Sequence, residues 1–145
     1  MDRYQVPIIA CLIFMKEGQV LLSRRFNTGW HDGDYDLPSG HVDPNETIKE
    51  AGAREAKEEA GLTLSPSDLD LVHVMHRHGE KADRVEFLLK VNQWEGEPIN
   101  AEPDKCDDIQ WFSVTGLPEN MIPKTKSALE HYLAGKNYSE FNWVK

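Results

Sequence analysis

Apolar runs alternate with polar, turn-forming segments along the chain, and two stretches carry helical signals instead. Apolar runs rich in β-branched and aromatic residues are typical of strands. Such runs cover Val6–Met15, Val20–Arg25, Leu69–His78, Arg84–Trp94 and Asp108–Ser113. Because only the polar segment Lys16–Gln19 separates the first two runs, they are expected to form a β-hairpin. Residues 48–60 and 123–134 are expected to be helices.

The segment 48–60 carries local signals for both ends of a helix. Thr47, followed three residues later by Glu50, forms a capping box that predicts a helix beginning at Ile48. The alanines that follow are strong helix formers. Gly61 stands where a left-handed C-cap is needed, so the helix is expected to end just before it.

Three glutamates lie in the last two turns of this predicted helix, at the end where acidic residues are least favourable. Glu55 precedes Glu58 and Glu59 by three and four residues, so the three carboxylates are expected to project from one side of the helix. Their repulsion costs about 0.2 to 0.5 kcal/mol per pair, and the helix dipole adds about 0.3 to 1 kcal/mol. A solvated helix face is the simpler interpretation of these residues alone, whereas their position at the negative helix end predicts a bound cation.

The spacing of residues around this helix resembles the signature of the Nudix hydrolases. The matching residues are Gly40, Glu46, Arg54, Glu55, Glu58, Glu59, Gly61 and Leu62. So many identities at fixed spacing in one window make a chance match improbable. The resemblance implies an α/β fold, in which a mixed β-sheet is sandwiched between helices (α/β/α) and the signature forms a loop, a helix and a loop. At this chain length, residues 1–145 are expected to form a single domain.

The resemblance also implies metal-dependent hydrolysis of a pyrophosphate bond. A diphosphate repels an attacking nucleophile, so divalent ions are needed to neutralise it and to lower the pKa of a bound water. Oxygen ligands favour Mg²⁺ or Mn²⁺. The implied ligands are the Gly40 carbonyl and the carboxylates of Glu55, Glu58, Glu59 and Glu102. Glu102 is included because it follows the sequence WEGEP, which resembles the matching loop of MutT-like members. One of Glu58 and Glu59, or a carboxylate of a neighbouring loop, would accept the proton from water.

Further residues are assigned to positioning and to substrate binding. By the resemblance, Arg54 holds one glutamate through a bidentate pair, and Glu46 braces the loop that enters the helix. Arg25 matches a position that contacts substrate phosphate in MutT-like members, while a solvated position at a strand end is an equally good interpretation. Trp30 or Tyr35 could stack on a base, although packing over a hydrophobic rim is slightly favoured.

The formal net charge of −9 narrows the choice of partners. Nucleic-acid-binding proteins usually carry a basic field, so duplex nucleic acid is not expected, whereas a small nucleotide complexed with a metal ion is. The two cysteines form no disulfide framework, and neither a leader nor a long apolar span appears, so a cytoplasmic protein without membrane association is expected. The aromatic tail 137–145 is expected to pack on the body or on a second subunit, which leaves a monomer or a homodimer.

The expected substrate is a nucleoside triphosphate, cleaved to a monophosphate and pyrophosphate as in the MutT-like branch, with sanitation of the nucleotide pool as the corresponding role. Hydrolysis of nucleotide sugars, dinucleoside polyphosphates or RNA 5′-end diphosphates would use the same signature and is the alternative. The charge of −9 disfavours an RNA substrate. A non-catalytic Nudix binding domain is a third interpretation, but such a domain would not need the full set of glutamates.

Overall fold

The computed structural model describes residues 2–144. This part of the chain contains β-strands, two α-helices and a short 3-10 helix, η1. In chain order the elements are β1 (Ile8–Ile13), β2 (Met15–Lys16), β3 (Gln19–Arg25), β4 (Tyr35–Asp36), β5 (Ser39–His41), α1 (Ile48–Ala60), η1 (Pro66–Asp68), β6 (Leu69–Arg77), β7 (Arg84–Val91), β8 (Cys106–Ser113), α2 (Pro123–Leu133) and β9 (Tyr138–Phe141). Neither α-helix in this part of the chain is long and apolar enough to cross a lipid bilayer.

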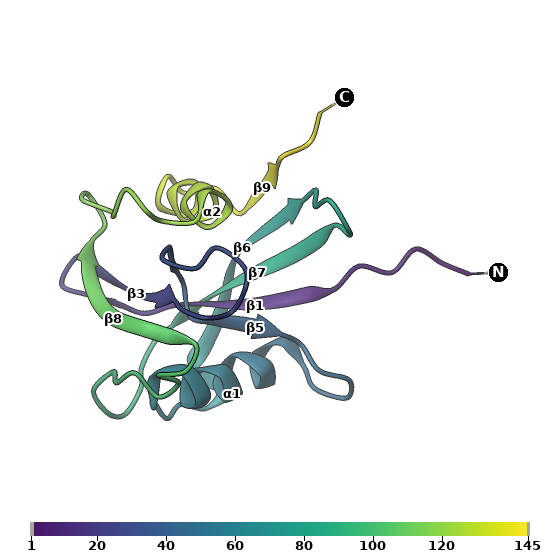
Figure 1. The fold of residues 1–145 in the computed structure, drawn as a ribbon. Helices are drawn as coiled ribbons and strands as arrows, with labels where there is room; N and C mark the ends of the chain where they lie inside the picture. Colours follow the sequence, from purple (N-terminus) through teal and green to yellow (C-terminus); the bar gives the residue numbers. More distant parts are fainter. Residues whose placement is uncertain (1, 145) are drawn as a thin grey trace.

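Helices cover both faces of a mixed five-stranded sheet (Figure 1). Its strand order is β5-β1-β7-β6-β9, in which β1 runs parallel to β7 and β6 runs parallel to β9. Helix α1 packs against β1 and β5, and α2 packs against β6 and β9. A second, antiparallel sheet contains β2, β3, β4 and β8. The expected α/β fold with a mixed sheet between helices is confirmed.

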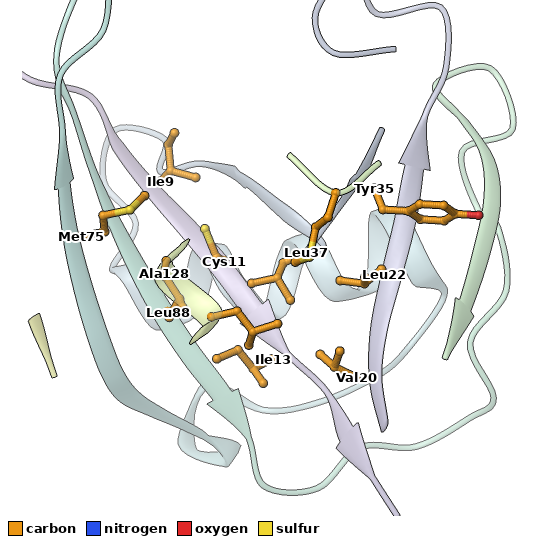
Figure 2. Packing of buried hydrophobic residues seen from close by; sticks show 12 residues of the cluster. Ile9, Cys11, Ile13, Val20, Leu22, Tyr35, Leu37, Met75, Leu88 and Ala128 are labelled. Carbon is orange, nitrogen blue, oxygen red and sulfur yellow. The ribbon is translucent and has the colours of Figure 1, made fainter. Parts of the chain in front are cut away.

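The core lies on both faces of β1, which explains why the apolar residues of this strand follow one another without alternation. The odd-numbered residues in 9–13 belong to an apolar layer that includes Ala128 of α2, and Figure 2 shows part of this layer. The even-numbered residues in 10–14 belong to a second layer, which includes Ala51 and Ala56 of α1. A strand that is buried on both faces is typical of the centre of a sheet covered by helices.

The predicted hairpin is only partly correct. β1 ends at Ile13 and pairs with β5 and β7, so the run Val6–Met15 is not one arm of a hairpin. Only β2 turns back onto β3, through Glu17 and Gly18, whose φ angles are 52° and 76°. Two positive φ angles are what a type I′ turn requires. Because residues on both sides of Phe14 are apolar, their pattern does not reveal that the chain leaves one sheet there and enters the other.

Helix α1 begins and ends where its local signals predicted. Thr47 Oγ1 accepts a hydrogen bond from the Glu50 N–H at 3.1 Å, and Glu50 Oε1 accepts one from the Thr47 N–H at 2.8 Å. Gly61 adopts a left-handed φ of 67°, and its N–H donates to the Lys57 carbonyl at 3.1 Å. These contacts satisfy backbone groups that a helix end leaves without partners.

The aromatic tail packs on the body of the protein, which is one of the two alternatives expected for it. Residues Tyr138–Phe141 form β9, which pairs with β6 in parallel. Beyond β9, the Trp143 indole N–H donates to the His76 carbonyl at 2.9 Å. Lys145, the last residue of the predicted tail, lies outside the described residues.

Candidate active site

The glutamates near the end of α1 lie in two different environments. Glu55 is 8% exposed and faces β5. Glu59 also reaches β5, where its Oε2 accepts a hydrogen bond from the Ser39 N–H at 2.7 Å. Glu58 is exposed, and its Oε2 accepts a hydrogen bond from Arg54 Nη1 at 3.2 Å. The three side chains span an arc of roughly 100° on one side of the helix, as expected, and Glu58 lies at the solvent-exposed edge of that arc.

A glycine makes room for the Glu55 carboxylate. Gly40 lies in β5 opposite Ala10 of β1. A Cβ atom on Gly40 would lie 2.1 Å from Glu55 Oε1, so any side chain at this position would displace the carboxylate. The Gly40 backbone and the Glu55 carboxylate are therefore neighbours, and both are among the oxygen groups expected to bind metal.

Arg54 connects the helix to the loop that precedes it. Its bidentate partner is Glu46, with Nε to Oε2 at 3.1 Å and Nη2 to Oε1 at 2.7 Å. Nη2 also donates to the His41 carbonyl at 3.1 Å, and Nη1 donates to Glu55 Oε1 at 2.8 Å. One guanidinium group thus fixes the entering loop, the end of β5 and the buried carboxylate relative to one another.

Burial and mutual repulsion perturb the two inward-facing carboxylates. Burial raises the pKa of Glu55 to about 7, with further contributions from the charges of Glu58 and Glu102 and an opposing one from Arg54. Burial and the charge of Glu55 raise the pKa of Glu59 well above its ordinary value. Carboxylates in this condition are stabilised by an added positive charge. As hard oxygen donors, they fit Mg²⁺ or Mn²⁺.

Two adjoining clefts open beside these residues. The first cleft has a volume of about 390 Å³ and is lined by Glu59 and Glu102 together with Arg24, Arg25 and Lys105. The second cleft has a volume of about 660 Å³ and extends past Gly40 toward α2. Arg25, Asp36 and Ser39 line both clefts. A molecule with an anionic centre and a distant second group could therefore occupy the two clefts at once.

Comparison with known proteins identifies the family. Residues 4–132 match the model of the NUDIX domain. The chain belongs to the Nudix hydrolase family. A Haemophilus influenzae protein named 8-oxo-dGTP diphosphatase is 27% identical over 139 residues, which are 96% of this chain and 98% of that one.

Two further relatives show how widely this Nudix fold is used. The isopentenyl-diphosphate Delta-isomerase of Clavibacter sepedonicus is 30% identical over 118 residues, which are 79% of this chain and 60% of the isomerase. A crystal structure of a MutT NUDIX hydrolase from Burkholderia pseudomallei has a TM-score of 0.78 and 29% identity, and the match covers 87% of this chain and 97% of that one.

Three residues of this Nudix chain were expected to contact substrate, and they differ in accessibility. Arg25 lines both clefts, and its guanidinium donates to the Trp30 carbonyl at 2.7 Å and to Thr28 Oγ1 at 2.9 Å. Trp30 is 41% exposed and lines the second cleft. Tyr35 is 5% exposed; its ring packs edge-on against Phe112. Tyr35 is therefore a core residue in this structure, and its ring is not available to stack on a base.

Two charged residues that line the clefts, Asp36 and Lys124, were assigned no role from the sequence. Asp36 is buried and accepts hydrogen bonds from the Thr125 hydroxyl at 2.7 Å and from the Leu37 N–H at 2.8 Å. Lys124 is also buried, in the first turn of α2. A cation at the positive end of a helix dipole is unfavourable without an acidic partner. The position of Lys124 could therefore have indicated a buried carboxylate nearby.

Proposed function

We propose that this Nudix enzyme uses Mg²⁺ or Mn²⁺ to hydrolyse a pyrophosphate bond in a nucleoside diphosphate derivative. In its most specific form, the reaction cleaves a nucleoside triphosphate to a monophosphate and pyrophosphate. The family match and the relative named as a diphosphatase support a pyrophosphohydrolase. Catalysis by this chain needs a place for divalent cations and a cleft that accepts a polyanion, and the described residues offer candidates for both.

The observation that carries the proposal is the pair Glu55 and Glu59 beside the first cleft. Both carboxylates are anchored, one by Arg54 and one by the Ser39 N–H, and these hydrogen bonds keep them near each other despite their repulsion. Carboxylates whose pKa values are raised by burial and by a neighbouring carboxylate cluster at functional sites. A cation-binding role explains why the fold holds them together.

The ion would be held by the carboxylates of Glu55, Glu58, Glu59 and Glu102 and by the Gly40 carbonyl. Within residues 2–144, no three acidic, histidine or cysteine side chains form a ready-made metal site. Glu58 is exposed and Glu102 lies on the loop before β8, so both have room to rotate toward an ion that the anchored pair attracts. When bound, a divalent ion would neutralise the diphosphate and lower the pKa of an attacking water.

The remaining residues of the first cleft would orient the substrate and accept a proton. Arg24 is paired with Asp107 at 2.7 Å, whereas among residues 2–144 Arg25 donates to neutral oxygens only, so Arg25 is the better candidate to bind a phosphate oxygen. The Oε2 of Glu59 already accepts a hydrogen bond from a backbone N–H. Glu58 and Glu102 are therefore the candidates that would take the proton from water.

Product analysis tests the reaction. A nucleoside triphosphate is incubated with the protein and Mg²⁺ in ¹⁸O-labelled water, and the products are separated and identified by mass spectrometry. We expect monophosphate and pyrophosphate as the direct products. Direct release of nucleoside diphosphate and orthophosphate would overturn the triphosphate form of the proposal.

Thermal unfolding tests the metal site without any substrate. A ligand that binds only the folded state stabilises it by about RT ln(1 + [L]/Kd). The melting temperature should therefore rise with added Mg²⁺ or Mn²⁺, and the rise should disappear when Glu55, Glu58 and Glu59 are all replaced by Gln. Replacement of the exposed Glu97 by Gln serves as the control and should preserve the rise. An equal rise in the triple variant would locate the metal elsewhere.

A further inference from the structure

The second cleft is unusually rich in positive charge for a protein with a net charge of −9. Its cationic lining residues are Arg25, Arg77, Lys81, Arg84 and Lys124. Its acidic lining residues are Asp36 and Glu80. The charge of this cleft therefore has the opposite sign to that of the whole protein.

The floor of the second cleft is a buried network centred on Glu86. The Glu86 carboxylate pairs with Lys124 Nζ at 2.5 Å through one oxygen and with Arg77 Nε at 2.5 Å through the other. Glu86 is 1% exposed, and Lys124 is 6% exposed. One carboxylate thus serves two cations, and even when Glu86 is added, cations still outnumber carboxylates by five to three around the second cleft.

Within the described residues, the hydrogen bonds of Arg84 at the rim of the second cleft go to neutral groups. Arg84 donates to the Ala82 and Asp83 carbonyls, both at 3.1 Å, and the described residues place no carboxylate within salt-bridge distance of it. Arg84 also lies directly opposite Arg77 in the β6–β7 pairing. Like charges opposite each other on neighbouring strands are destabilising, and within the described residues Glu86 pairs with Arg77 but not with Arg84.

Trp30 lies over the same cations and leaves little space for a stacked base. Its ring centroid lies 4.9 Å from the Arg25 guanidinium carbon, 6.0 Å from that of Arg77 and 5.8 Å from Lys124 Nζ. The His31 ring packs edge-on against it at 4.5 Å. A neutral base would have to displace these cations from the indole, whereas an anion would bind beside them.

The second cleft adjoins strand β5, whose residues contact two of the carboxylates that are proposed to hold metal. Ser39, Gly40 and His41 of β5 all line it. The backbone of Ser39 donates to Glu59, and Gly40 contacts the Glu55 carboxylate. A ligand in the second cleft is thus separated from the Glu55 and Glu59 carboxylates by a single strand.

We propose that the second cleft binds a second anionic group of the substrate, a phosphate or a carboxylate, remote from the pyrophosphate bond that is cleaved. This proposal rests on the proposed function for the identity of the cleaved bond. The substrate class is accordingly a diphosphate compound with an additional acidic group at its far end. Arg84 and Lys81 supply the charge for that group, and the Glu86 network holds Arg77 and Lys124 in place behind them.

Binding measured by calorimetry in EDTA tests the proposal without catalysis. Adenosine 5′-monophosphate is compared with its 2′- and 3′-phosphorylated forms and with its 3′-O-succinyl ester. At least one of these probes with a second anionic group should bind ten times more tightly than the monophosphate. A gain with the phosphorylated probes alone would identify phosphate, and a gain with the succinyl ester would admit carboxylate. Equal affinity for all four probes would overturn the proposal.

Two variants locate the effect. Arg84→Gln combined with Lys81→Gln removes rim charge without touching the buried network, so the tenfold gain should fall below twofold. Lys90→Gln removes a cation from an exposed position farther along β7, and it should leave the gain unchanged. A gain that persists in the double variant would also overturn the proposal. Because no turnover is involved, a negative result in the product analysis does not change the meaning of these measurements.

Discussion

Arg54 and Glu46 share two hydrogen bonds across the entrance to α1, at 3.1 Å and 2.7 Å. The same guanidinium donates to the buried Glu55. Lysine carries the same charge but cannot hold two carboxylates in a planar arrangement. Arg54→Lys should therefore lower kcat at least tenfold while the unfolding free energy falls by only about 1 kcal/mol. Kinetics with Mg²⁺ and urea unfolding measure the two effects. The exposed Lys57→Arg is the control on the same helix, and unchanged kcat in Arg54→Lys would contradict this role.

Gly40→Ala should weaken the metal site more than it weakens the fold. The new Cβ would meet Glu55 Oε1 at 2.1 Å, and the carboxylate at the end of a flexible side chain would move away. The Mg²⁺ concentration for half-maximal activity should rise about tenfold or more, as for a lost charge-assisted contact, while the melting temperature in EDTA changes little. Gly116→Ala, whose Cβ would have its nearest contact at 3.9 Å, is the matched control. An unchanged Mg²⁺ requirement would refute the importance of this close approach.

Glu55→Gln should stabilise the metal-free protein in a pH-dependent manner. The folded-state pKa of Glu55 is about 7, above the roughly 4.3 of an unfolded glutamate, so its ionisation destabilises the fold as pH rises between these values. In EDTA the unfolding free energy of the variant should exceed that of the wild type by about 1 to 3 kcal/mol at pH 8, and the two should be equal near pH 4. Activity with Mg²⁺ should fall at least a hundredfold. Denaturant titrations at both pH values, with Glu97→Gln as the control, measure the gain, and its absence at pH 8 would contradict the account.

Glu102→Gln should lower kcat roughly tenfold to a thousandfold, because a charge-stabilising contact would be lost. Glu102 lines the first cleft with Glu59, whereas Asp104 is exposed on the same loop. Asp104→Asn should therefore leave kcat nearly unchanged. Steady-state kinetics at saturating Mg²⁺ compare the two variants. Two silent substitutions would mean that this loop holds no metal.

Glu86→Gln should destabilise the protein at neutral pH, because it removes the carboxylate that pairs with the buried Lys124 and the partly buried Arg77. Although burial opposes ionisation, Lys124 and Arg77 lower the pKa of Glu86 below its ordinary value. A lowered folded-state pKa gives stability that is present above the unfolded value of about 4.3 and is lost as pH falls through the folded one. The unfolding free energy of the variant should be about 3 kcal/mol lower than that of the wild type at pH 7. This difference should shrink below about pH 4. Urea unfolding across this pH range tests the prediction, with substitution of the exposed Glu119 by Gln as the control. A difference in stability that stays constant with pH would contradict the prediction.

The parts of the fold that local chemistry determines were predictable from the sequence. The bounds of α1 follow from the capping box and Gly61, which act within one turn of each end. The division of β1 and β2 between two sheets was not predictable, because it depends on which strands farther along the chain pair with each of them. Periodicity placed Glu55, Glu58 and Glu59 on one side of the helix, yet it did not show that Glu55 is buried whereas Glu58 is exposed and bonded to Arg54.

The second cleft was the least accessible to sequence analysis. Glu86 and Lys124 are 38 positions apart and meet only when α2 packs on the sheet. Arg77 and Arg84 become neighbours only through the β6–β7 register. Residue spacing within one segment cannot predict contacts between residues that are distant in sequence. The resemblance to the family covers the shared signature and does not extend to the charged residues of the second cleft.

The pairing of β9 with β6 makes the order of synthesis relevant to solubility. Val74 of β6 aligns with Tyr138 of β9, so one edge of β6 stays unpaired until a strand more than sixty residues later has been translated. Until then, β6 presents an open edge to which other nascent chains can add. Contacts so distant in sequence also form slowly. Chaperone dependence during rapid expression, and aggregation of chains interrupted before β9, would be direct consequences of this one late strand.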